Sequence, residues 1–478
     1  MTSPIRTLLS LSALAAAVTL HAPGVQADSP RADQSTLSPL LNQGDRVLKF
    51  DWPTVQIGTG EYAEGPTGVT VIHFTKRSFA AVDVRGGGPG TVNTDYLRIG
   101  YDVPELDAVV FSGGSWYGLE GTTAVATALK DDGVRDGLWT NLALSVGAII
   151  YDFGERRLNE IYPDKRLAQA ALRAARPGVF PLGAQGAGRF AKTGSLFGCN
   201  AFSGQGAAFR QVGELKIAAF VVVNALGAVT RRDGHLAACY PDTHWPKDLR
   251  TADLLAGYPA SRKPDWAPTP LSEDKKRNTT ISLIVTNQKL PRAQLERLAT
   301  QVHSSMGRAI QPFATEFDGD VLYAVSTAEL DRPVDESETP NIDLDVLAGE
   351  VMWDAILTSI PEQPVQPKVP ARITAEPRVL QRYAGEYAFS PFARLRLTVV
   401  GNKLVAQASG PRKIYSIAAD APTELQPLSA TQFTVPGRYP LVLDLATPDT
   451  LVINPGHWQQ TGTLVTPPSG PNTQRKSP

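Results

Sequence analysis

Several segments of this chain are apolar at almost every position, a pattern that strongly restricts the folds open to it. A strand with one face in water alternates apolar and polar residues, whereas a strand covered on both faces is apolar throughout. Between residues 69 and 351 such runs alternate with segments of helical periodicity, which is typical of a mixed α/β or α+β domain. The predicted strands are Val69–Phe74, Ala108–Ser112, Val146–Phe153, Ile217–Asn224, Ile281–Thr286 and Val321–Ser326.

Two helices are predicted from apolar residues at helical spacing, and both stripes are interpreted as core packing. The first begins at Pro291 and carries Leu295, Leu298, Val302 and Met306. The second begins at Asp343 and carries Val346, Leu347, Met352, Ala355 and Ile356.

Two segments predict linkers. Residues 261–277 are rich in Pro, Ser, Asp and Lys, without apolar periodicity, and predict an exposed linker. Residues 363–377 are rich in proline, which favours an extended spacer. Beyond it apolar and polar residues alternate, and Gly401-Asn402 marks a hairpin turn. Residues 378–466 therefore predict a small all-β module, followed by a disordered tail at 467–478.

The N-terminal residues predict where the protein is located, and the net charge restricts its predicted partners. Residues 1–27 combine Arg6, an apolar run from Thr7 to Leu20 and a small-residue exit at Val25-Gln26-Ala27, which predicts a signal peptide and a secreted or periplasmic protein. No later segment is long and apolar enough for a membrane-spanning helix, so no membrane insertion is expected. A net charge of -1 over 478 residues gives no electrostatic argument for nucleic acid, and a small or neutral partner is expected.

Only two cysteines are present, Cys199 and Cys239, too few for a metal quartet. They form either one disulfide or two buried free thiols, and neither alternative makes them catalytic. The chain lacks the G-x-S-x-G elbow, the H-E-x-x-H zinc helix and the Walker phosphate loop. No cofactor and no metal are predicted.

The Asn278-Thr279 bond lies where the first linker meets a predicted strand. If this bond is cut, Thr279 becomes an N-terminus that carries both a hydroxyl nucleophile and an amine able to act as its base. Asn278-Thr279-Thr280 also matches the glycosylation sequon, so these residues alone do not decide. Near another strand end, Trp116 and Tyr117 follow Gly113-Gly114-Ser115 and are candidates for a substrate wall.

Five motifs, in order and at similar spacing, carry a more specific signal. They are Tyr151-Asp152-Phe153, the segment 204–210 (GQGAAFR), Asn278-Thr279-Thr280-Ile281-Ser282, the segment 301–306 (QVHSSM) and Asp318-Gly319-Asp320. Over residues 45–360 the chain resembles the DmpA-like family of self-processing aminopeptidases, of the N-terminal nucleophile type. Within that family it is most similar to the hydrolases of 6-aminohexanoate (nylon) oligomers.

The resemblance implies an α+β fold, a four-layer αββα sandwich. The all-β module lies outside this resemblance and is itself similar to small lipocalin-like domains. The family resemblance also implies an α chain of residues 28–278 and a β chain whose core part is 279–362, assembled as a tetramer of heterodimers. Thr279 is then the nucleophile, and Lys192 lies beside it and lowers the pKa of its amine. Asn224 is the oxyanion or substrate-positioning amide, Tyr151 the active-site tyrosine, and Asp318 and Asp320 an acidic pair that orients the nucleophile.

The predicted function is that of a secreted amidohydrolase that cleaves its own Asn278-Thr279 bond and then hydrolyses amide bonds of short oligomers or peptides. One alternative is an aminopeptidase or esterase of the same family that removes N-terminal residues. Another is an inactive family member that acts as a binding protein through its β module. Residues 193–200, which follow Lys192, depart from the family pattern and are predicted to shape the pocket mouth.

Overall fold

The computed structural model describes residues 34–100, 104–154, 157–258, 266, 278–331, 342–370 and 377–466. The predicted signal peptide, the predicted C-terminal tail and all of the first linker except Trp266 lie outside these residues. In the described part of the chain, no helix is long and apolar enough to cross a membrane.

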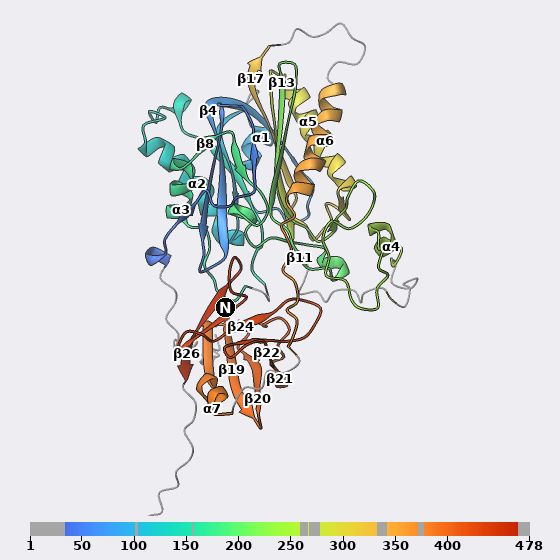
Figure 1. Cartoon of the computed structure of the whole chain (residues 1–478). Coiled ribbons are helices and arrows are strands. Elements are labelled where there is room, and N and C mark those ends of the chain that lie inside the picture. The colour runs from blue at the N-terminus through green and yellow to red at the C-terminus, as the bar shows by residue number, and fades with distance from the viewer. Residues whose placement is uncertain are drawn as a thin grey trace, which may run out of the picture.

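The long strand β4 (Thr67–Val84) connects the two halves of the central sheet (Figure 1). Its first part pairs with β3 (Val55–Tyr62) and β6 (Glu105–Ser112), and residues 79–84 pair with β17 (Val321–Leu330). Beyond β17 lie β15 (Thr279–Gln288), β13 (Leu215–Asn224) and β12 (Gln205–Val212). Beyond β6 lie β7 (Ser145–Ile149) and β5 (Thr91–Val92), and β3 also pairs with β1 (Leu40–Leu41) and β8 (Arg176–Pro177).

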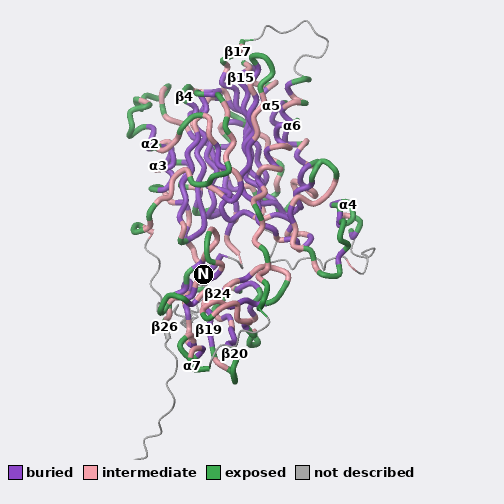
Figure 2. Tube along the Cα trace, in the orientation of Figure 1, coloured by how far each residue is buried: buried purple, intermediate pink, exposed green. Residues whose placement is uncertain are grey.

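The central strands are buried on both faces, as their apolar sequences predicted (Figure 2). In β13, Phe220 and Val222 belong to a cluster that also contains Val109 and Phe111 of β6. The two halves of the sheet therefore share one buried cluster. The alternate residues of β13, such as Val221, pack instead against helices.

Helices cover both outer faces of this arrangement (Figure 1). The pair α5 (Arg292–Ser305) and α6 (Ile342–Thr358) packs on β13, β15 and β17, and the pair α2 (Glu120–Asp131) and α3 (Lys165–Arg173) packs on the first part of β4 and on β6. The chain is thus a mixed α/β structure. The short helices are α1 (Thr94–Ile99), α4 (Thr251–Leu255) and α7 (Pro377–Leu380).

Two details of the predicted elements were wrong. Val346, assigned to the buried stripe of α6, is 59% exposed, because the buried face of that helix runs through Leu344, Ala348 and Val351. The strand predicted to reach Phe153 ends at Ile149, and the following residues leave the sheet. This early end brings Tyr151 out at the edge of the sheet, beside the candidate site.

The all-β module contains nine strands of one antiparallel sheet within residues 385–466. Its order begins with β21 and ends with β22, and these two strands are separated only by Leu425, so the sheet curls into a nearly closed barrel. Leu395, Leu397 and Phe433 are among its buried residues. Its strands are β18 (Gly385–Ser390), β19 (Ala393–Val400), β20 (Lys403–Ser409), β21 (Thr423–Glu424), β22 (Gln426–Pro427), β23 (Gln432–Thr434), β24 (Val442–Asp444), β25 (Thr450–Ile453) and β26 (Gln460–Thr466).

Three short strand pairs complete the described structure. They are β2 (Val47–Lys49) with β9 (Val179–Pro181), β10 (Lys192–Thr193) with β11 (Ala201–Phe202), and β14 (Ala228–Val229) with β16 (Ile310–Gln311). The second pair carries Lys192. The two cysteines form a disulfide, which settles the question that the sequence left open.

Candidate active site

Thr279 is the first residue of β15, and Asn224 is the last residue of β13. The two residues are direct partners in the antiparallel register. Both are almost completely buried, with Thr279 only 4% exposed. The sheet therefore fixes the predicted nucleophile and the predicted amide side by side.

The carbonyl oxygen of Asn278 accepts two hydrogen bonds. The Gly319 N–H donates to it at 2.9 Å, and the Thr279 hydroxyl Oγ1 donates at 2.5 Å. A carbonyl that accepts a backbone N–H is polarised, and the same N–H can stabilise negative charge that develops on the oxygen. The arrangement places a hydroxyl against the carbonyl group of the bond predicted to break.

Gly319 is confined at this point. A Cβ atom added to it would lie 2.8 Å from the Thr279 hydroxyl oxygen and 2.8 Å from the Gly88 carbonyl oxygen. The Gly88 N–H in turn donates to the Asp318 carbonyl oxygen at 2.9 Å. The glycine-rich segment 86–90 therefore allows its backbone to approach the backbone of Asp318 and Gly319 closely, beside the nucleophile.

Asp318 and Asp320 hold backbone groups around the nucleophile. Asp318 accepts the N–H of Leu226 at 3.3 Å and the hydroxyl of Thr315 at 2.6 Å. Asp320 accepts the N–H groups of Thr280 and Ala314. Asp320 thus fixes the loop before β17 against the strand that Thr279 begins, and Asp318 fixes the same loop against the residues that follow β13.

Burial sets the protonation of this pair. Burial raises the pKa of Asp318, although the hydrogen bonds from Thr315 and Leu226 oppose the rise. Burial, together with the charge of Asp318, raises the pKa of Asp320 well above its usual value. Two carboxylates close together in a dry site resist being ionised at the same time.

The side-chain amide of Asn224 links two backbone segments. Its Oδ1 accepts the Lys192 N–H at 3.1 Å, and its Nδ2 donates to the Tyr151 carbonyl oxygen at 3.1 Å. Asn224 therefore positions both Lys192 and Tyr151 relative to Thr279. The ammonium nitrogen of Lys192 lies 4.9 Å from the centre of the Phe190 ring.

A pocket of about 440 Å³ opens at the Asn278-Thr279 bond. Of the predicted residues, Trp116 and Tyr151 line it together with Asn278 and Thr279, whereas Tyr117 packs against Phe153 and Tyr162. Lys192, Asn224, Asp318 and Asp320 are not among the lining residues. The remaining lining residues are Gly88, Ser115, Ile149, Glu316 and Phe317.

Sequence reasoning missed Glu316, Phe317 and the N–H donor of Gly319. Their positions follow from the loop that precedes β17, which returns beside Asn278 through a parallel bridge between Asn278 and Asp318. The available signal was that Glu316 and Phe317 directly precede the Asp318-Gly319-Asp320 motif. Among the described residues, no His, Cys, Asp and Glu side chains form a group that could hold a metal ion.

Comparison with known proteins identifies the family of this site. The model of peptidase family S58 matches residues 50–363. The chain belongs to peptidase family S58. A 6-aminohexanoate-oligomer endohydrolase of Paenarthrobacter ureafaciens is 40% identical over 336 residues, which cover 69% of this chain and 90% of that protein.

Other similar proteins are more distant. An uncharacterized aminopeptidase of Mycobacterium tuberculosis is 30% identical over 318 residues, covering 64% of this chain and 87% of that protein. A solved Burkholderia β-aminopeptidase is 20% identical, with a TM-score of 0.46, and covers 69% of this chain and 91% of that chain. The predicted family is confirmed, and the protein is a hydrolase of amide or peptide bonds.

Proposed function

We propose that this hydrolase cleaves its own Asn278-Thr279 bond and then uses Thr279 as an N-terminal nucleophile on the amide bonds of short oligomers. The observation that carries the proposal is the Asn278 carbonyl oxygen, which accepts both the Thr279 hydroxyl and the Gly319 N–H. A nucleophile and an oxyanion donor on one carbonyl group are what acyl transfer requires.

Self-cleavage is an N-to-O acyl shift followed by hydrolysis. Thr279 Oγ1 attacks the Asn278 carbonyl carbon while the Gly319 N–H stabilises the charge on the carbonyl oxygen. The new C–O bond replaces the C–N bond, and the hydroxyl proton ends on the released Thr279 amine. Water then hydrolyses the ester, which leaves a carboxylate on Asn278 and restores the Thr279 hydroxyl.

Turnover repeats the same chemistry on a substrate. The freed α-amine, whose ordinary pKa is about 7.7 to 8.0, accepts the hydroxyl proton and passes it to the leaving amine. An amide nitrogen carries two hydrogens, and one of those on Asn224 Nδ2 is used by the Tyr151 carbonyl oxygen. The other is the donor that we assign to the substrate oxyanion. Lys192 favours the neutral, basic form of the amine, because a nearby positive charge lowers its pKa.

The substrate class that we propose is an oligomer of aliphatic ω-amino acids, cleaved at internal amide bonds. Two observations support it: the name and 40% identity of the Paenarthrobacter relative, and a pocket walled by Trp116, Ile149 and Phe317 that suits an apolar chain. The pocket also contains Glu316. A carboxylate there suits a free substrate amine, which favours aminopeptidase activity as the second candidate function.

An assay of capped against free-amine oligomers separates these two functions. We expect cleavage of a 6-aminohexanoate trimer whether or not its amine is acetylated, and little effect of Glu316→Gln on the acetylated trimer. Cleavage of the free-amine trimer alone, lost in Glu316→Gln, would instead establish the aminopeptidase.

The proposal extends to the architecture. We infer a four-layer αββα sandwich from the shared cluster between the sheet halves and the helix pairs on the outer faces. We also infer that the module is a lipocalin-like barrel, given its curled antiparallel sheet. The predicted signal peptide supports export of the protein. We further infer an α chain of 28–278 and a β chain from 279 that stay together, as heterodimers in a tetramer.

A further inference from the structure

The β module lies outside the residues that match family S58, yet it contacts the catalytic domain beside the candidate site. Several of its contacts fall on residues 184–202, here called the Lys192 segment. This segment contains β10 and β11, which pair through only two residue pairs. A strand pair this short is not stable by itself, so its neighbours determine its position.

Trp458 of the module packs on the strand that pairs with Lys192. Its ring stacks on Phe202 with the ring centres 4.1 Å apart and the planes 16° apart. Phe202 is the direct strand partner of Lys192. The Trp458 indole N–H also donates to the Arg189 carbonyl oxygen at 2.9 Å, so Trp458 contacts the chain on both sides of Lys192.

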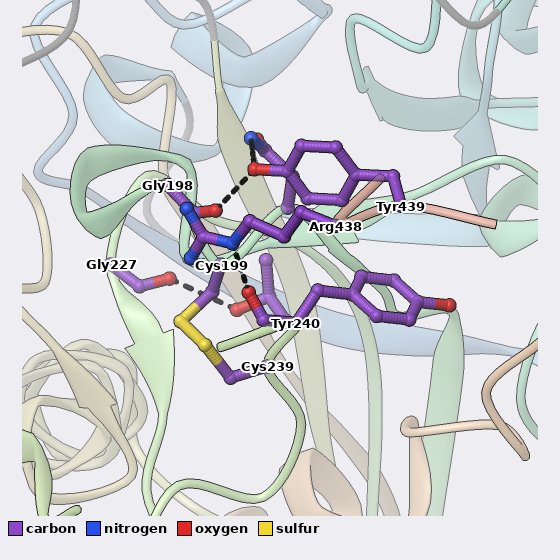
Figure 3. Close-up of a disulfide and its surroundings, with 9 residues drawn as sticks. Gly198, Cys199, Gly227, Cys239, Tyr240, Arg438 and Tyr439 are labelled. Carbon is purple, nitrogen blue, oxygen red and sulfur yellow. Dashed lines mark hydrogen bonds between the residues drawn. A yellow bond between two sulfur atoms is a disulfide. The ribbon is translucent and has the colours of Figure 1, made fainter. Parts of the chain in front are cut away.

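Tyr439 and Arg438 of the module hold the far end of the segment (Figure 3). The Tyr439 hydroxyl donates to the Gly198 carbonyl oxygen at 2.5 Å and accepts from Asn200 Nδ2 at 3.0 Å. The Arg438 guanidinium donates to the Tyr240 carbonyl oxygen. Gly198 and Tyr240 adjoin the two cysteines of the disulfide, so the module contacts both sides of that crosslink.

The opposite side of the segment contacts the residues around the nucleophile. The Lys192 N–H donates to Asn224, the strand partner of Thr279. The Ser195 hydroxyl lies 3.5 Å from Asn278 Oδ1. The Lys192 segment is therefore held between the module and the Asn278-Thr279 bond.

We propose that Trp458 and Tyr439 are positioning residues for amide hydrolysis, and that the module acts by holding the Lys192 segment in place. The inference rests on the proposed role of Lys192 beside Thr279. A small displacement of this segment moves the charge of Lys192 and loosens the backbone that Asn224 holds. Misplacement by about 1 Å lowers a rate by on the order of a hundredfold.

Full-length variants test this. Trp458→Ala and Tyr439→Phe should lower kcat about tenfold to a hundredfold and leave KM nearly unchanged, because Trp458 and Tyr439 do not line the substrate pocket. Amide hydrogen exchange at residues 192–202 should accelerate in both. Trp458→Phe, which keeps a ring against Phe202, should restore most of kcat.

Tyr383→Phe is the matched control, because the Tyr383 hydroxyl donates to Ala430 at 3.1 Å within the module. It should behave as wild type. Unchanged exchange at 192–202 together with unchanged kcat in Trp458→Ala and Tyr439→Phe would overturn the inference, as would an equal loss in Tyr383→Phe. If the wild type proves uncut and inactive, the proposed function fails, while the exchange data still decide whether the module holds the segment.

Discussion

Asn224 and Thr279 lie directly opposite each other in the antiparallel pair of β13 and β15. This register places the Asn224 side-chain amide next to the Thr279 hydroxyl, at the end of the sheet where the chain is predicted to be cut. The Asn224 side chain also forms hydrogen bonds with the backbones of Lys192 and Tyr151. One strand pair thus brings together residues that are far apart in the sequence.

Replacing the nucleophile tests both reactions at once. Thr279→Ala removes the only hydroxyl that we assign to attack, so the chain should remain uncut and activity should fall by on the order of a millionfold. Thr279→Ser keeps the hydroxyl and should still be processed. Gel electrophoresis and oligomer assays of the two purified variants check this, and processing of Thr279→Ala would contradict it.

Gly319→Ala should slow self-cleavage. The added methyl group would lie 2.8 Å from both the Thr279 hydroxyl and the Gly88 carbonyl oxygen, so the donor N–H must shift away from Asn278. Losing one such donor lowers a rate about a hundredfold to a thousandfold. A time course of processing measures this, with Gly307→Ala as the control because nothing lies within 4 Å of its added atom. Equal rates in the two variants would contradict the oxyanion role.

Asn224→Ala should lower kcat by about a hundredfold to a thousandfold, since it removes an oxyanion donor and frees two backbone segments. Asn287 offers a matched control at the other end of β15. It accepts the Lys216 N–H at 2.8 Å and donates to the Glu214 carbonyl oxygen at 2.8 Å. Asn287→Ala should therefore lower thermal stability but leave kcat close to wild type. If both variants lose the same activity, Asn224 has only a structural role.

Reducing the disulfide should destabilise the protein. The crosslink joins cysteines 40 residues apart, and a loop of this length contributes about 3 to 4 kcal/mol to the free energy of unfolding in the chain-entropy model. Adding a reductant should lower the thermal midpoint of the wild type and leave Cys199→Ser unchanged. An equal response of both proteins would argue against a disulfide in solution.

The buried acidic pair should make stability fall as the pH rises. Both carboxyls have pKa values raised above the ordinary 3.8, so between that value and the raised one the folded state binds more protons than the unfolded state. The free energy of unfolding then decreases through this window, and it keeps its full value below it. Asp318→Asn removes one titrating group and lowers the pKa of Asp320, so urea unfolding across a pH series should show a shallower decrease. If the free energy of unfolding of Asp318→Asn falls with pH as steeply as that of the wild type, the acidic pair does not cause the decrease.

Local sequence patterns predicted the framework well. In an apolar run such as Ile217–Asn224, successive side chains of a strand point to opposite faces, so both faces must be buried. A strand covered on both faces was therefore predicted. The full length of β4 was not predictable, because the polar residues 75–78 interrupt its apolar pattern at a register shift. The family resemblance supplied most of the candidate site residues, of which Tyr151 lines the pocket at the Asn278-Thr279 bond and Asn224 pairs with Thr279.

The rest of the site depends on contacts without a local signal. The Gly319 N–H reaches Asn278 only because the loop before β17 returns to the start of β15. Likewise, nothing in the sequence around Trp458 indicates that it stacks on Phe202, 256 positions earlier in the chain. Such contacts depend on how distant elements pack together, and the spacing of apolar residues within one segment does not predict this packing.

The most direct test of the account is the intact mass of the purified wild-type protein under denaturing conditions. We expect two fragments, one of which begins at Thr279 and extends through the β module. A single uncut chain, stable on storage and active on oligomers, would contradict it, because the hydrolase would then work without a free Thr279 amine.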